Sequence, residues 1–173
     1  VRAAMGFDAG ANAPPRLIDR SLGGGAILDV GVYPVSLARL VAGAAIGRPF
    51  DNPTTLKGVG RHGETNVDEE AFALLRFESG ITAECATGIR RNMVNSATIF
   101  GTEGEIHLPD PWVPGRNAGP SDATIRVTAN GERRTEEVRR PEHLFAFEAE
   151  AVSAAIRGGK RESDPPAVGW ADS

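Results

Sequence analysis

The chain has 173 residues, enough for one domain with a sizeable core, and its 40% hydrophobic and 24% charged residues are ordinary for a globular protein. The net charge of −4, with basic residues scattered along the chain, argues against a nucleic-acid partner, whose recognition needs clustered Lys and Arg. No apolar run approaches the ~20 residues that cross a bilayer and no signal-peptide pattern opens the chain, so we expect no membrane partner and a cytoplasmic location.

Cysteine and histidine content bears on redox and metal chemistry. Cys85 is the only cysteine, so no intrachain disulfide can form, and a reducing compartment fits this composition. Its neighbours are small, which favours a small buried residue over a nucleophile. The three histidines, His62, His107 and His143, lack the spacing of metal ligands, and we predict no metal site.

The N-terminal quarter predicts one strand and one helix. Residues 1–7 alternate weakly and predict a short strand, which a Pro-rich loop follows. After three glycines at 23–25, residues 26–41 show apolar side chains at helical spacing, and Gly43 is the expected helix end. Pro34 lies inside this stretch and predicts a kink or a division of the helix into two pieces.

From residue 54 onward the pattern indicates an antiparallel sheet. Residues 71–77 carry apolar side chains on both faces, and residues 81–89 form the return strand after a turn at 78–80. The dipeptide Asn130-Gly131 is the strongest short hairpin signal in the chain. Further strands flank this dipeptide and the turn at 101–104; they are residues 96–100, 105–108, 124–129 and 132–138. Consecutive hairpins make an antiparallel sheet.

A loop and a helix complete the predicted fold. Residues 109–122 form a Pro/Gly-rich loop with Trp112, too long for a plain connector. Pro141 opens a helix that the glycines at 158–159 end. We therefore predict an α+β fold, an open antiparallel or mixed sheet of about six strands with helices packed on one face. Residues 1–173 are expected to be a single domain.

Residues 58–63 spell G-x-G-x-x-G, the pattern of a dinucleotide-binding turn, and Glu78 lies ~20 residues on, where a ribose-binding acid would stand. The context argues against this function, because the motif needs a helix that begins within it and faces the pyrophosphate. Here a strand-like run and a hairpin follow. A self-contained dinucleotide-binding domain that uses Gly58 to Gly63 stays as an alternative, and a glycine-rich strand end and loop is the simpler interpretation.

The most informative segment is residues 23–34, which holds Asp29 and Tyr33. These two residues are four apart, so a helix places them on one face, and Gly31 between them would leave that surface open to a close approach. A phenol can pass a proton to and from a developing alkoxide, but near neutral pH it needs a nearby cation. From the residues alone a packing role for Tyr33 and a helix-dipole role for Asp29 remain the simpler interpretations.

This segment closely resembles the Gfo/Idh/MocA oxidoreductase family, and most of all its branch of dimeric dihydrodiol dehydrogenases and NADP-dependent xylose dehydrogenases. The likeness covers residues 16–19, 22–38, 67–69, 77–80, 99–106, 147–152 and 170–173. The resemblance implies the C-terminal substrate-binding and dimerisation domain of a two-domain enzyme. The N-terminal Rossmann domain, with its Glu-Lys-Pro motif, and the final helix of the family are absent from the chain.

The resemblance also implies a chemistry, hydride transfer between NAD or NADP and a hydroxyl-bearing carbon of a sugar or diol. Tyr33 stands where many members have a His and would be the acid/base, while Asp29 would hold a substrate hydroxyl or position Tyr33. Arg16 is a candidate substrate-binding residue, and a surface role is an equal alternative. The cofactor would be bound mainly by the absent domain, so the chain alone is expected to be inactive and to bind no cofactor.

Two further expectations concern association. A mixed apolar outer face of the sheet predicts a homo-oligomer, most simply a dimer that pairs two identical sheets. The alternative is that the loop at 109–122 folds its Trp112 over that face. A non-catalytic association module of the same fold is the competing function, because a fold does not dictate a reaction.

Overall fold

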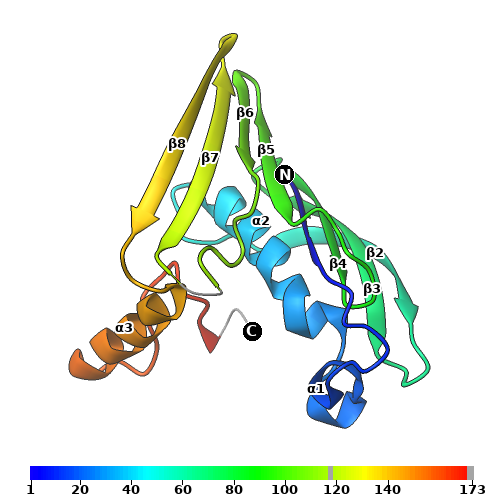
Figure 1. Cartoon of the computed structure of the whole chain (residues 1–173). Helices are drawn as coiled ribbons and strands as arrows, with labels where there is room; N and C mark the ends of the chain where they lie inside the picture. Colours follow the sequence, from blue (N-terminus) through cyan, green and yellow to red (C-terminus); the bar gives the residue numbers. More distant parts are fainter. Residues whose placement is uncertain (117–118, 171–173) are drawn as a thin grey trace.

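The structure, a computed structural model, describes residues 1–116 and 119–170; part of the loop at 109–122 and residues 171–173 of the tail lie outside that range. One open sheet of eight strands crosses the molecule in the order β2-β3-β4-β1-β5-β6-β7-β8 (Figure 1). The strands are β1 (Arg2–Gly6), β2 (Pro53–His62), β3 (Asp68–Phe77), β4 (Thr82–Gly88), β5 (Ser96–Gly101), β6 (Gly104–Leu108), β7 (Ser121–Ala129) and β8 (Glu132–Arg140). The predicted α+β class is confirmed.

The sheet differs from the sequence prediction in its number of strands. The expected number of about six was too low, because the glycine-rich residues of β2 form a full edge strand paired with β3. Of the two predicted arrangements, antiparallel or mixed, the structure has the mixed one, since β1 enters the sheet between β4 and β5 and runs parallel to β4. The β7–β8 hairpin turns at the predicted dipeptide, where Asn130 and Gly131 have φ angles of 52° and 82°.

The helix predicted over residues 26–41 is present, and it changes its geometry just before Pro34. A short α1 (Pro15–Ile18) and a 3-10 turn (Arg20–Leu22) precede a π-helical turn, η2 (Ile27–Gly31), which continues into α2 (Val32–Ala44). Pro34 lies in the first turn of α2, but η2 before it is also helical, so the helix runs through the proline without a break. The change from π-helical to α-helical geometry falls just before the proline, at the junction of η2 with α2.

Gly43 does not end α2 as predicted. The helix continues to Ala44, and the left-handed glycine after it is Gly47, with a φ of 69°. Gly43 instead lets the segment at Phe50 pass close to the helix, since a Cβ on Gly43 would lie 2.6 Å from the Cα of Phe50. A close approach of two backbones, rather than a helix stop, explains this glycine.

The core lies between η2–α2 and one face of the sheet. Small side chains on the helix, including Ala38 and Ala42, let it pack closely on Leu75 and Phe77 of β3. A second buried cluster joins α1 and η2 to β1 through Leu17, Val30, Met5, Ala26 and Ile89. Fully burying one large aliphatic or aromatic side chain stabilises a fold by about 1.5–3 kcal/mol, so these clusters hold η2 firmly on the sheet.

The helical stretch Arg20–Ala44 bears on the expectation of no membrane partner. By length and composition alone it could cross a bilayer, although none of its uninterrupted apolar runs is that long. In the most apolar 18-residue window of this stretch, 44% of the residues are buried inside the fold. A helix that packs on a sheet in this way fits a core helix.

The helix predicted after Pro141 is α3 (Leu144–Arg157), and it ends at the predicted glycines. Its apolar positions, among them Phe145, Val152 and Ile156, are exposed. Figure 1 shows α3 beside the lower end of the β7–β8 hairpin, away from the strands that α2 covers. Among the helices of the described residues, η2 and α2 alone pack extensively on the sheet, and the expectation that α3 helps to cover the same face was wrong.

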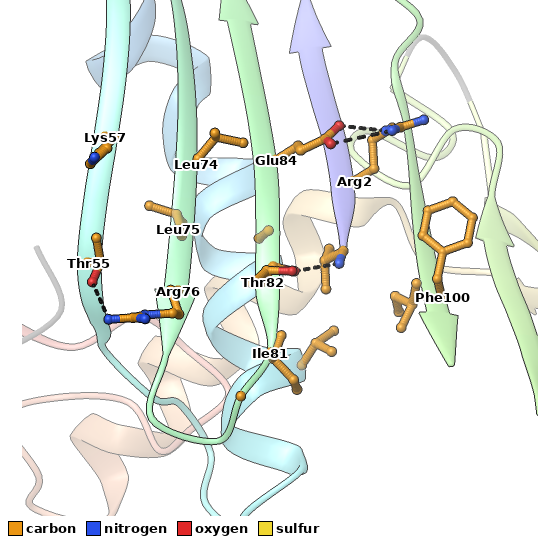
Figure 2. Close-up of a pocket in the computed structure, with 15 residues that line it drawn as sticks. Arg2, Thr55, Lys57, Leu74, Leu75, Arg76, Ile81, Thr82, Glu84 and Phe100 are labelled. Atoms are coloured by element: carbon orange, nitrogen blue, oxygen red, sulfur yellow. Dashed lines mark hydrogen bonds and ion pairs between the residues drawn. The ribbon is translucent and has the colours of Figure 1, made fainter. Parts of the chain in front are cut away.

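The opposite, outer face of the sheet carries exposed apolar side chains in its centre (Figure 2). Side chains alternate along the strands as predicted, with Ala83 and Cys85 buried while Thr82 and Glu84 are exposed. The large apolar side chains on the outer face are Val59, Phe72, Leu74 and Phe100. Trp112 does not cover them: it packs on the buried cluster of α1 and η2, and its indole N–H donates to the carbonyl of Ala4 at 2.8 Å.

Candidate active site

The three consecutive glycines bring the chain back over α1 before η2 begins. Gly25 has a φ of 128°, and its N–H donates to the carbonyl of Leu17 at 2.9 Å. A Cβ on Gly24 would lie 2.8 Å from that same carbonyl oxygen. Any larger residue at Gly24 would push the turn away from α1. The turn therefore needs glycine for η2 to lie against α1.

The structure brings two of the predicted site residues together. The Arg16 guanidinium, on α1, forms an ion pair with the carboxylate of Asp29, on η2. The Asp29 side chain is 21% exposed and that of Arg16 is 65% exposed. The carboxylate is therefore held at the edge of the fold with its charge balanced, while the guanidinium also reaches solvent.

Tyr33 stands four residues after Asp29, in the first turn of α2, and 37% of it is exposed. Its ring meets Trp112 edge-on, with ring centroids 6.2 Å apart and an interplanar angle of 61°. Both rings border a hollow of about 830 Å³, which Leu28 and Val32 also line. The sequence did not indicate that Trp112 belongs to the candidate site. Its only signal was the unusual length of the loop that contains it.

Gly31 has a different role from the one expected. It is buried and faces the sheet, where a Cβ would lie 3.4 Å from the methyl carbon of Thr87 on β4. The prediction that Gly31 opens the surface between Asp29 and Tyr33 was therefore wrong. The glycine brings the π-helical turn close to β4, and the exposed surface is formed by the neighbouring positions.

The glycine motif of residues 58–63 is not a phosphate-binding turn. Gly58 and Gly60 lie within β2, opposite Ala73 and Ala71 of β3. β2 is followed by a turn and then by β3, so no helix begins within the motif to face a pyrophosphate. The structure thus overturns the alternative of a dinucleotide-binding domain built on this motif.

A second hollow of similar size, about 860 Å³, lies on the outer face of the sheet (Figure 2). It is lined by Arg2, Lys57, Leu74, Glu84 and Phe100, among others, and shares no residue with the hollow at Tyr33. Arg2 and Glu84 are ion-paired across it at 2.7 Å. This hollow belongs to the apolar outer face rather than to the Asp29–Tyr33 surface.

Within residues 1–116 and 119–170, no three His, Cys, Asp or Glu side chains are grouped so that they could hold a metal ion. Cys85 is buried, as predicted, and burial raises the pKa of its thiol to about 11. Only the thiolate is an effective nucleophile, so Cys85 is not a candidate nucleophile.

We expect Cys85 to resist thiol reagents while the protein is folded. At pH 8 the raised pKa leaves the group protonated, and its burial between α2 and β4 blocks access. Labelling with a chromogenic disulfide reagent should be slow in buffer and complete in denaturant. Rapid native labelling at pH 8 would show that α2 does not stay packed on the sheet.

The arrangement of the glycines, η2, α2 and the sheet matches a known family. Residues 1–107 match the family model described as the GFO/IDH/MocA C-terminal domain. The chain belongs to the GFO/IDH/MocA family. Together with the eight-stranded open sheet, this match confirms the family resemblance of the glycine-rich segment.

Relatives within the GFO/IDH/MocA family are oxidoreductases. A trans-1,2-dihydrobenzene-1,2-diol dehydrogenase from Mus musculus is 30% identical over 100% of this chain and 48% of its own length. An uncharacterized oxidoreductase, ORF334, from Rhizobium meliloti is 34% identical over 92% of this chain and 47% of its own length. The chain thus spans about half the length of the curated relatives it matches.

Solved structures share the fold. The aldose-aldose oxidoreductase from Caulobacter crescentus, complexed with glycerol, superposes with a TM-score of 0.76 at 25% identity, over 99% of this chain and 48% of that one. A 3-ketoreductase from Actinomadura kijaniata, in complex with NADP, has a TM-score of 0.70 at 24% identity, over 91% of this chain and 45% of that one. The second likeness supports the fold alone.

Proposed function

We propose that this chain is the C-terminal catalytic and dimerisation domain of an NAD(P)-dependent oxidoreductase that acts on a hydroxyl of a sugar or diol. Two contacts support the proposal, the ion pair of Arg16 with Asp29 and the edge-on contact of Tyr33 with Trp112, together with the four-residue spacing of Asp29 and Tyr33. The mouse dihydrodiol dehydrogenase and the Caulobacter aldose-aldose oxidoreductase support the substrate class.

Each residue has a role in this proposal. Tyr33 takes the proton of the substrate hydroxyl during oxidation and returns it during reduction. Asp29 accepts a hydrogen bond from a second substrate hydroxyl, and Arg16 balances the carboxylate charge and reaches the substrate from the solvent side. Trp112 closes one wall of the hollow and holds the Tyr33 ring.

The cofactor belongs to another part of the protein in this proposal. A nicotinamide cofactor would supply the hydride chemistry. The described residues offer no phosphate-binding turn at the one glycine motif that resembles one. We propose that an N-terminal Rossmann domain binds NAD or NADP and contributes a lysine that stabilises the Tyr33 phenolate.

The test of the proposed function is turnover by the longer protein that contains this chain. Purified protein is assayed against a panel of aldoses and vicinal diols with NAD and with NADP. We expect turnover of at least one panel member, with one cofactor preferred. If the longer protein binds a cofactor but turns over no sugar or diol, the proposed substrate class is wrong.

We expect residues 1–173 alone to bind neither NAD nor NADP with useful affinity. The physical reason is that Gly58 and Gly60 are occupied in the β2–β3 pairing and cannot wrap a pyrophosphate. Isothermal titration of the isolated chain should give no measurable heat at millimolar cofactor, whereas the longer protein should bind. Micromolar binding by the isolated chain would contradict this assignment.

The second candidate function is a non-catalytic association module. The outer face favours it, because large apolar side chains there lie uncovered by the described residues. In both candidate functions, we propose that two copies of the chain pair through this face. A dimer without turnover or cofactor binding would favour the association module.

A further inference from the structure

Asp68, the first residue of β3, is bonded to the start of η2. Its Oδ2 accepts the N–H of Ile27 at 2.7 Å. The first N–H groups of a helix have no partner within the helix, and a carboxylate satisfies one of them and is favoured there by the helix dipole. Ile27 lies two residues before Asp29, so this bond holds the backbone from which the Asp29 side chain projects.

Two neighbours complete this anchor. A Cβ on Gly25 would lie 2.3 Å from Oδ1 of Asp68, so only a glycine lets the carboxylate approach this closely. From the next strand, the buried hydroxyl of Thr87 donates to the carbonyl of Ala26 at 3.1 Å. The start of η2 is therefore held from both β3 and β4.

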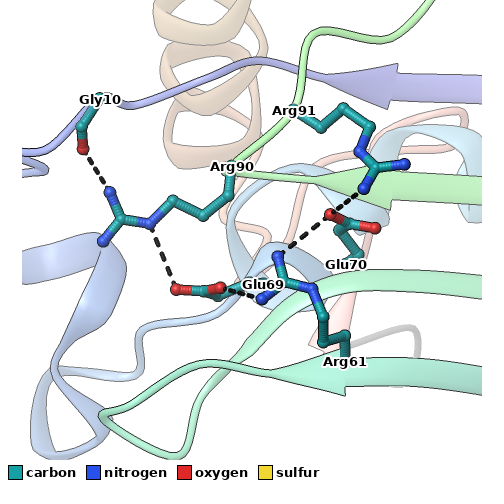
Figure 3. A network of polar contacts seen from close by, with 6 residues as sticks. All are labelled: Gly10, Arg61, Glu69, Glu70, Arg90 and Arg91. Atoms are coloured by element: carbon teal, nitrogen blue, oxygen red, sulfur yellow. Dashed lines mark hydrogen bonds and ion pairs between the residues drawn. The ribbon is translucent and has the colours of Figure 1, made fainter.

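Glu69, the next residue of β3, reaches the segment that leads to Arg16 (Figure 3). Its Oε1 accepts a hydrogen bond from Nε of Arg90 at 3.2 Å. The same guanidinium donates from Nη1 to the carbonyl of Gly10. Gly10 belongs to the loop between β1 and α1, and α1 carries Arg16. Two neighbouring carboxylates of β3 thus hold two different segments.

These segments meet again in the candidate site, where Arg16 and Asp29 form their ion pair. We infer that Asp68 and Glu69 are positioning residues, which orient the Arg16–Asp29 pair by holding the backbone on either side of it. The inference rests on the proposed function, because it assigns to these carboxylates the orientation of groups that meet the substrate.

The ion pair needs such support. The Arg16 side chain is 65% exposed, and exposed ion pairs contribute little to holding a geometry. Groups that meet a substrate must stay within about 0.5 Å of the productive arrangement. A displacement of about 1 Å can lower turnover by about 100-fold. The start of β3, which lies between β2 and β4 in the sheet, supplies the support that the exposed pair lacks.

The chain offers a matched control in Glu70. It is the third consecutive carboxylate of β3, it is buried, and it is ion-paired with Arg61 at 3.1 Å and Arg91 at 3.2 Å (Figure 3). Neither arginine bonds to the segments that carry Arg16 and Asp29. Glu70→Gln therefore disturbs the same strand end and the same network without releasing either anchor.

The experiment measures turnover and amide hydrogen exchange in the longer protein. Asp68→Ala should lower kcat per folded enzyme by about 10- to 100-fold with KM changed less than about threefold. Asp68→Asn keeps an oxygen that can accept the Ile27 N–H and should recover kcat to within about threefold. Glu69→Gln should give a smaller loss, and Glu70→Gln almost none.

Hydrogen exchange keeps the inference testable without any substrate. Exchange at residues 26–30 should be faster in Asp68→Ala than in Glu70→Gln, at conditions where both are folded. Equal exchange and equal kcat in these two variants would overturn the inference. Should Asp68→Ala fail to fold, Thr87→Val removes only the hydroxyl bonded to Ala26 and should show the same pattern more weakly.

The outcomes separate this inference from the proposed function. Should Tyr33→Phe and Asp29→Asn leave turnover unchanged, the proposed function fails, whatever Asp68 does. Should both lower turnover while Asp68→Ala behaves like Glu70→Gln, only the positioning role fails.

Discussion

Tyr33→Phe is expected to lower kcat of the longer protein by about 100-fold or more, because a positioned acid/base contributes about that much to a rate. This loss corresponds to about 2.7 kcal/mol of transition-state stabilisation. Phe keeps the ring that meets Trp112 edge-on, so packing at the surface of α2 should persist. We expect KM to change little and the free energy of unfolding to stay within about 0.5 kcal/mol.

Tyr33→Ala is the companion variant for this prediction. It removes the hydroxyl and also the aromatic contact with Trp112, so it should lose stability as well as turnover. Steady-state kinetics and thermal unfolding of both variants separate the two roles. Normal turnover in Tyr33→Phe, with a lowered melting temperature, would identify Tyr33 as a packing residue.

Phe72→Arg is expected to dissociate the proposed dimer. Phe72 lies on the outer face between Val59 of β2 and Ala86 of β4, so a two-fold pairing of sheets would bury the new charge among apolar side chains. A buried charge without a partner costs about 3–5 kcal/mol, which corresponds to a rise in Kd of roughly 100-fold or more. Thr82→Arg, on the same face, should act in the same direction.

Val94→Arg is the matched control, because Val94 is an exposed apolar residue outside the strands. Sedimentation of the longer protein at micromolar concentration should show dimers for the wild type and the control, and monomers for Phe72→Arg. An oligomeric state indifferent to both Phe72→Arg and Thr82→Arg would mean that the outer face is not the interface.

Local signals predicted the parts of the fold that depend on neighbouring residues. Asn130-Gly131 adopts the left-handed angles of its turn, and the helix changes its geometry just before Pro34. β2 was predicted only as a glycine-rich strand end and loop, because glycine is depleted in strands, and at Gly58 and Gly60 pairing with β3 overrides that preference. The parallel pairing of β1 depends on β4, more than 70 residues away, so the residues near β1 carry no signal of it.

The candidate site also has features that the sequence predicts and features that only the fold shows. The four-residue spacing of Asp29 and Tyr33 is a local feature, and the sequence was sufficient to single them out. Trp112 reaches Tyr33 from a loop 79 residues later, and only the fold shows that contact. α3 illustrates the limit of amphipathic patterns, which predict an apolar face on a helix but not what covers it.

The proposed role of Tyr33 is best tested by a crystal structure of the longer protein with its cofactor and a non-reacting sugar or diol analogue. We expect the Tyr33 hydroxyl within hydrogen-bond reach, about 2.6–3.2 Å, of the hydroxyl on the reacting carbon. Asp29 or Arg16 should contact a second hydroxyl of the analogue. An analogue bound with its reacting carbon at another side chain, away from Tyr33, would contradict the proposed role.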